Sequence, residues 1–156
     1  MSWTDTLLLR TFGWLRIPLI ALVQPKVICL TKERTEIKIP LNYVTKNHLN
    51  CMYFGALTIG ADCTGGLFAL HYIHKTGNKI NFLFKDFKAD FLRRAESDVH
   101  FINKEGPKII TAIKQAIKTG ERINKSVHIT AITPKVSGND PVARFALTLS
   151  LKVKKQ

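Results

Sequence analysis

Residues 52–73 have the sequence MYFGALTIGADCTGGLFALHYI, and this stretch decides the fold. It is apolar on almost every side, and Asp62 carries its only charged side chain. A helix that is apolar on every face must be buried on every face. Its four glycines lower the helix propensity, so we expect close approach of the helix backbone to a sheet or to a second helix. The tetrapeptide Lys-Thr-Gly-Asn at 75–78 predicts the end of this helix.

The segments on both sides of this helix alternate apolar and polar side chains, as strands do. Residues 26–41 predict a hairpin that turns at residues 32–34. Residues 79–95 predict a long strand in which the apolar side chains change parity, so we expect a bend or bulge near Lys85 and Asp86. Three further strands and one inserted amphipathic helix are predicted at 97–103 (strand), 107–119 (helix), 122–133 (strand) and 142–155 (strand).

A sheet that wraps around one long helix is the arrangement that buries a helix apolar on all sides. Strands that follow one another directly in the chain should pair antiparallel. We therefore predict an α+β fold, with an antiparallel sheet wrapped around a long central helix. The 156 residues are the size of a single domain, which we assign to residues 26–156.

Residues 1–25 are predicted to form a helical segment that packs on this domain. The segment is apolar, but Arg10, Arg16 and Pro18 interrupt it. Its longest uncharged run is far shorter than the ~20 residues that cross a bilayer, so we expect no transmembrane segment. Its basic and aromatic side chains would also suit contact with a membrane interface.

The chain has 24 Lys and Arg against 11 Asp and Glu, a formal charge of +13. This balance favours an anionic partner, although a solvated basic surface is an equally good interpretation. No nucleic-acid-binding motif accompanies the charge, so no nucleic-acid partner is expected. The three cysteines show no CxxC pair, which predicts buried thiols in a cytoplasmic protein and no metal site.

Asp62 is the first candidate for chemistry, because a lone carboxylate in an apolar helix is costly to bury. Its pKa should be perturbed, as at many catalytic sites, although a solvent-filled interface or backbone hydrogen bonds would also accommodate it. The free N–H groups at the helix start could polarise a carbonyl, and Gly55 would allow a substrate to approach them. Asn47 and His48 lie in the preceding loop, where both are also ordinary loop residues.

The segment 47–62, NHLNCMYFGALTIGAD, resembles the loop-and-helix signature of the hotdog-fold acyl-CoA thioesterases, in particular their phenylacetate-type branch. In that signature an Asn precedes a His-Gly-Gly at the helix start, and an acid follows about two turns later. Asn47 and Asp62 match, whereas residues 53–55 are Tyr-Phe-Gly and keep only the last glycine. Residues 88–95, KADFLRRA, also resemble a strand segment of this family, and the likeness extends from Val27 to Val153.

The resemblance implies an enzyme that hydrolyses an acyl thioester to a free acid and a thiol. It implies a homodimer or tetramer whose sheets join edge to edge, with the acid of one subunit facing the helix N-terminus of another. Asp62 would then be the general base or the nucleophile, and the Gly55 N–H would polarise the thioester carbonyl. Asn47 would orient water or substrate, and the Tyr53 hydroxyl would stand in for the missing histidine.

The substrate implied by the resemblance is an acyl-CoA or an acyl-carrier protein, with no further cofactor. Arg93 and Arg94 are candidates for binding the phosphates of coenzyme A, although a solvated strand end explains them equally well. The acyl pocket is predicted along the central helix, lined by Phe54, Leu57 and Phe68.

Three other functions remain open from the sequence. The loss of His-Gly favours a non-catalytic hotdog protein that binds acyl-CoA or lipid. A dehydratase acting on 3-hydroxyacyl thioesters would use the same fold and would need His48 beside an acid. The basic charge leaves a nucleic-acid binder as the last alternative.

Overall fold

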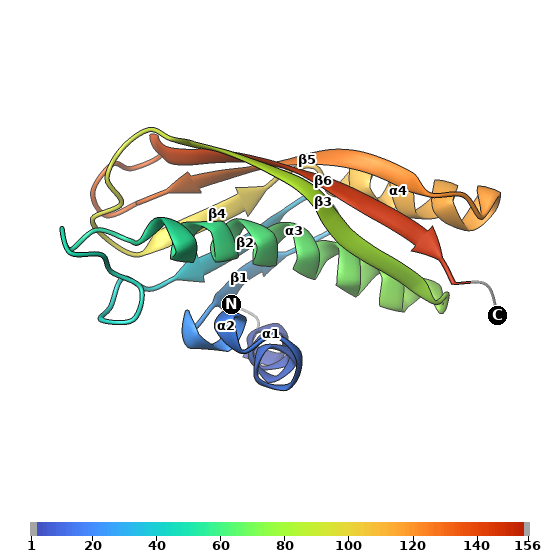
Figure 1. Cartoon of the computed structure of the whole chain (residues 1–156), viewed down its shortest axis with the longest axis horizontal. Coiled ribbons are helices and arrows are strands. Elements are labelled where there is room, and N and C mark those ends of the chain that lie inside the picture. The colour runs from blue at the N-terminus through green and yellow to red at the C-terminus, as the bar shows by residue number, and fades with distance from the viewer. Residues whose placement is uncertain (1–2, 155–156) are drawn as a thin grey trace.

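The computed structural model describes residues 3–154, and Figure 1 shows one long helix enclosed by a curved sheet. The helices are α1 (Trp3–Arg16), α2 (Pro18–Leu22), α3 (Phe54–Thr76) and α4 (Gly106–Thr119). The strands are β1 (Lys26–Leu30), β2 (Thr35–Ile39), β3 (Ile80–Phe91), β4 (Val99–Asn103), β5 (Ile123–Ile132) and β6 (Pro141–Val153). These bounds lie within a few residues of those predicted from the sequence.

The six strands form one sheet in the order β1-β2-β4-β5-β6-β3, and every pair of neighbours is antiparallel. Apolar side chains of the sheet, α3 and α4 pack into one continuous core. The predicted α+β fold, a sheet wrapped around a long helix, is therefore confirmed. Strands β1 and β3 are the two edges of the sheet, and β3 is more than twice as long as β1.

Glycines of α3 allow the helix to approach the sheet closely, as predicted. A methyl group at Gly60 would lie 2.3 Å from the ring of Phe101 on β4, and one at Gly65 would lie 3.1 Å from the ring of Phe84 on β3. Both aromatic rings occupy space that any larger side chain would need. The helix ends at Gly77, whose φ of 68° is left-handed, so the predicted end is confirmed as well.

The predicted bulge in β3 is present at Lys85 and Asp86. The register with β6 shifts between Phe84, which faces Leu149, and Phe87, which faces Leu147. The carboxylate of Asp86 accepts a hydrogen bond from the backbone N–H of Thr148 at 3.1 Å. The extra residue brings the apolar side chains before and after it to the same face of the sheet.

The two N-terminal helices are fixed on β1 and α3. The backbone N–H of Val27 donates to the buried Thr6 hydroxyl at 2.9 Å. The guanidinium of Arg10 donates to the carbonyls of Pro25 and Gln24 at 3.1 and 3.3 Å. Leu9 of α1 packs in a small second core with four other buried side chains, those of Ile20, Val27, Ile37 and Cys63. None of the helices within residues 3–154 has the length and apolar character needed to cross a membrane.

Candidate active site

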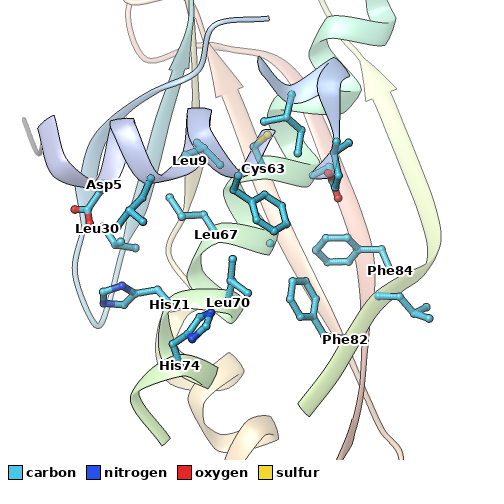
Figure 2. A pocket seen from close by; sticks show the side chains of 17 residues that line it. Asp5, Leu9, Leu30, Cys63, Leu67, Leu70, His71, His74, Phe82 and Phe84 are labelled. Carbon is cyan, nitrogen blue, oxygen red and sulfur yellow. The ribbon is translucent and has the colours of Figure 1, made fainter. Parts of the chain in front are cut away.

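A cavity of about 630 Å³ lies between α1, α3 and β3, and its volume is in the range of small-molecule sites. Figure 2 shows Phe82 and Phe84 of β3 on one side, Leu9 of α1 on another, and Leu67 and Leu70 of α3 between them. Most of the other lining side chains are also apolar, among them Leu8, Phe12, Ile17, Ile20, Leu30 and Leu83. The cavity therefore suits an aliphatic or aromatic group.

Asp62 is one of the few ionisable side chains that line this cavity. It is partly buried, and its carboxylate makes no hydrogen bond or ion pair within residues 3–154. Burial raises the pKa of its carboxyl. A carboxylate with free oxygens and a raised pKa is a stronger base than an ordinary aspartate and can accept a proton from water.

Cys63 also lines the cavity, but it is not a candidate nucleophile. Burial raises the pKa of its thiol, and the neighbouring Asp62 raises it further. Because the thiolate is the reactive form of cysteine, this thiol is inert at neutral pH.

Polar side chains line the cavity at a second place, where Figure 2 shows Asp5 of α1 near His71 of α3, with His74 close by. Burial lowers the pKa of His71, Lys75 lowers it further, and the charge of Asp5 acts in the opposite direction. Asp62 and His71 are separated by nine residues of helix, or about 14 Å along its axis. The cavity thus extends along α3 from Asp62 to the polar side chains around His71, and apolar side chains line it between them. This shape suits an extended aliphatic chain that ends in a polar group.

The N-terminus of α3 carries free donors, as predicted. Tyr53 precedes the helix and makes no side-chain capping hydrogen bond. The backbone N–H groups of Phe54, Gly55 and Ala56 have no hydrogen-bond acceptor within the described part of the chain. The ring of Tyr53 lies against Gly55, and it is tilted by 55° to the ring of Phe54, with the ring centroids 4.7 Å apart. The donors therefore open onto a partly exposed aromatic surface.

Gly55 and Asp62 lie on the same face of α3, because seven residues are close to two full turns. Their separation along the helix axis is about 10 Å, which is too far for both to contact one carbonyl group. Within one chain, the predicted acid and the predicted donor are therefore not brought together.

The chain is similar to a known protein family over most of its length. Residues 6–150 match the profile of the family described as Domain of unknown function (DUF4442). The chain belongs to the DUF4442 family. No protein with a curated function matches this DUF4442 chain.

Several solved structures share the fold of this DUF4442 protein. PA5026 of Pseudomonas aeruginosa, described as a protein of unknown function and probable thioesterase, superposes with a TM-score of 0.78 at 20% identity over 96% of each chain. The protein OLEI01261 of Chlorobaculum tepidum, of unknown function, gives 0.81 at 10% identity over 96% of this chain and 94% of its own. Thioesterase HI1161 of Haemophilus influenzae gives 0.69 at 16% identity, over 98% and 93%. These likenesses confirm the hotdog fold that the sequence predicted.

The loop before α3 holds Asn47 in a structural position. Its side-chain oxygen accepts hydrogen bonds from the backbone N–H groups of Leu49 and Cys51, at 2.9 and 3.2 Å. These bonds fix the turn that leads into the helix. His48 is exposed and has no hydrogen-bond or ion-pair partner among residues 3–154, so within this part of the chain it is not paired with an acid as dehydratase chemistry would need.

The predicted substrate-binding residues of this DUF4442 chain fall into different environments. Phe54 is exposed at the helix start, whereas Leu57 and Phe68 lie in the main core and do not line the large cavity. Arg93 pairs with Asp140 at 2.8 Å, and Arg94 is exposed with no ion pair in the described chain. Among residues 3–154, no three His, Cys, Asp or Glu side chains gather as a metal site would require.

The contribution of α1 to the cavity was not predicted from the sequence. Leu8, Leu9 and Phe12 come from a segment that was expected only to pack on the domain. Two signals could have indicated the cavity. One is the high content of large apolar side chains in α1, and the other is Gly66, which follows Asp62 by one helical turn and leaves room for a methyl group on that face.

Proposed function

We propose that this DUF4442 protein is a thioesterase that hydrolyses the thioester of an aliphatic acyl chain. The observation that carries the proposal is Asp62, an unpaired carboxylate that lines an apolar cavity and whose pKa burial raises. The solved relatives that carry the name thioesterase support the same reaction. The cavity along α3 supports an aliphatic acyl chain as the part of the substrate that is bound.

In the proposed reaction Asp62 takes a proton from a water molecule, whose oxygen attacks the thioester carbonyl carbon. The carbonyl oxygen becomes an oxyanion, which the free N–H groups near Gly55 stabilise by hydrogen bonding. The carbon–sulfur bond then breaks, and the leaving sulfur receives the proton held by Asp62. The products are a free acid and a thiol, and the carboxylate is regenerated.

A second subunit completes this site, because Asp62 and Gly55 of one chain are too far apart along α3 to act together. The edge strand β3 supports a homodimer. Its 12 residues leave one row of backbone groups unpaired in the single chain, and Leu83, Phe87 and Phe91 are at least 40% exposed. An exposed, apolar edge of this length favours pairing with another strand. Joined edges would bring Asp62 of one chain toward Gly55 of the next.

The net charge of +13 supports an anionic carrier for the acyl group, either coenzyme A or an acidic carrier protein. Arg94 is free to contact such a carrier, whereas Arg93 would first have to leave Asp140. The proposed substrate is therefore an aliphatic acyl-CoA or acyl-carrier protein.

The test is thiol release from acyl-CoAs of short, medium and long chain length. Wild type should release thiol, and Asp62→Asn should lose at least about a hundredfold in kcat/KM, as is usual when a general base is removed. Glu121→Gln, an exposed carboxylate beyond α4, is the matched control and should keep full activity. Absence of turnover on every chain length, or full activity of Asp62→Asn, would reject the proposal.

Non-catalytic binding of an acyl thioester is the second candidate, because Tyr53 and Phe54 replace the His-Gly of the thioesterase signature and the Tyr53 ring lies against Gly55. Calorimetry with the same acyl-CoAs separates the two functions. Binding without thiol release would favour this candidate, and turnover would exclude it.

A further inference from the structure

Helix α1 turns an apolar face to solvent, opposite the face by which it is attached to the protein. Thr6, Leu9 and Gly13 are buried on the attached side. At 100° per residue, the opposite side carries Trp3, Leu7, Leu8, Trp14 and Leu15, together with Thr4 and Thr11, and no charged residue. A surface helix ordinarily presents charged and polar side chains there.

The exposure of this face is large. Trp3 and Leu15 are 75% and 76% exposed, and Trp14 is 65% exposed. Of the 19 large apolar side chains that are exposed among the described residues, nine lie between Trp3 and Leu22. A concentration of exposed large apolar side chains of this kind marks an interaction site.

Hydrogen bonds and packing attach α1 to the rest of the protein, so the orientation of its exposed apolar face is fixed. The Thr6 hydroxyl accepts the Val27 N–H, and Arg10 donates to two backbone carbonyls. Gly13 packs so closely on α2 that a methyl group there would lie 2.9 Å from the backbone nitrogen of Ala21. Helix α1 is thus attached to the rest of the protein through Thr6, Arg10 and Gly13, and its apolar face is left exposed to solvent.

The chemistry of the face fits a lipid surface. Both tryptophans of the protein, Trp3 and Trp14, lie on it, and tryptophan prefers the boundary between lipid headgroups and acyl chains. Arg16 is exposed in the last turn of α1, and Asp5 is the single acid of this helix. The net charge of +13 attracts an anionic bilayer.

We infer that the apolar face of α1, continued by Leu19 and Leu22 of α2, docks on an anionic lipid bilayer, with α1 lying in the plane of the interface. Leu8 and Phe12 are exposed and also line the cavity, so docking would bring the mouth of the cavity to the membrane surface. The inference stands apart from the proposed catalysis, because it depends only on this surface.

The experiment is co-sedimentation with vesicles of phosphatidylcholine, with and without phosphatidylglycerol, combined with tryptophan fluorescence. Because both tryptophans lie on α1, their emission reports directly on this face. We expect binding to the anionic vesicles, a blue shift of the emission, and weaker binding at high salt. The double variant Leu7→Ser with Leu15→Ser should bind at least roughly tenfold more weakly, since it removes two apolar side chains that would enter the bilayer.

Val136→Ser is the control, because Val136 is an apolar side chain that is 57% exposed but lies in the turn between β5 and β6. It should bind like wild type. Equal binding by the double variant, or no binding of wild type to anionic vesicles, would overturn the inference. So would self-association of wild type in gel filtration that the double variant abolishes without any vesicle binding, since the face would then join two copies.

Discussion

The ring of Tyr53 lies so close to Gly55 that a methyl group at Gly55 would come within 2.5 Å of the ring carbon Cε1. Tyr53 is half exposed, so its ring can rotate away into solvent. We therefore expect Gly55→Ala to change the free energy of unfolding by less than about 1 kcal/mol. The added methyl group and the displaced ring would obstruct the free N–H groups, so kcat/KM for thioester hydrolysis should fall roughly tenfold or more. Thermal unfolding and thiol-release kinetics of the same preparation check both effects.

Gly60→Ala, unlike Gly55→Ala, should lower the free energy of unfolding. A methyl group there would meet the fully buried ring of Phe101 at 2.3 Å, and the ring has no open space into which to move. We expect destabilisation of about 1–3 kcal/mol or more, measured by chemical denaturation. An unchanged midpoint of unfolding would mean that α3 and β4 are not packed as closely as described.

Asp62→Asn should stabilise the folded protein while it removes activity. Burial raises the pKa of Asp62 in the folded state, so the folded protein keeps this proton to a higher pH than the unfolded chain does. Stability is therefore lost as pH rises from the ordinary aspartate value, about 3.9, through the folded pKa. The variant should be more stable than wild type at neutral pH, by on the order of 1 kcal/mol, and equally stable at pH values below both pKa values. Unfolding curves at several pH values test this.

The same raised pKa predicts the pH dependence of catalysis. A general base must be ionised, so kcat/KM should fall on the acid side with an inflection above the ordinary aspartate pKa. An inflection at or below the ordinary aspartate pKa would mean that Asp62 is not the general base.

Gly66→Leu should shorten the acyl chain that the protein accepts. Gly66 lines the cavity, and a methyl group there would meet nothing closer than the ring of Phe84 at 3.8 Å. A leucine can therefore enter the cavity, and the helix gains up to about 1 kcal/mol from the loss of a glycine. Hydrolysis of long-chain acyl-CoA should fall roughly tenfold, while short-chain hydrolysis should be retained. An equal loss of hydrolysis on acyl-CoAs of every chain length would mean that the acyl chain does not bind in this cavity.

Asp98→Asn should loosen the loop that leads to α3. The carboxylate of Asp98 accepts hydrogen bonds from Lys38 Nζ at 2.9 Å and from the Leu41 N–H at 3.0 Å. Burial alone would raise the pKa of Asp98, but these two bonds outweigh it and hold the pKa below its usual value. The stabilisation is thus present above the ordinary aspartate pKa and is lost as pH falls through the folded value. We expect a cost of about 1–2 kcal/mol at neutral pH that disappears in acid, measured by thermal unfolding.

Sequence patterns predicted the architecture well, because periodicity and glycine placement are local signals. The parity change around Lys85 and Asp86 indicated the bulge, and Gly77 marked the end of α3. The apolar run of 52–73 required an enclosing sheet, and the sheet is present.

The cavity could not be predicted in the same way. Because α3 is apolar on almost every side, its sequence does not distinguish side chains that face the sheet, such as Leu57, from those that face the cavity, such as Leu70. The other wall comes from Leu9 of α1, which meets Cys63 across more than fifty residues of sequence. Only tertiary packing decides such contacts.

The bulge in β3 also determines where this strand can change in length. The three-residue step from Phe84 to Phe87 stands opposite the two-residue step from Leu149 to Leu147. Deleting Lys85 would leave an uninterrupted alternation with every phenylalanine still facing inward, whereas a deletion within 80–83 or 88–91 would reverse part of the strand. Tolerance to single-residue deletions along this edge is therefore confined to the bulge at Lys85 and Asp86, and natural variants of the strand should differ in length at the bulge.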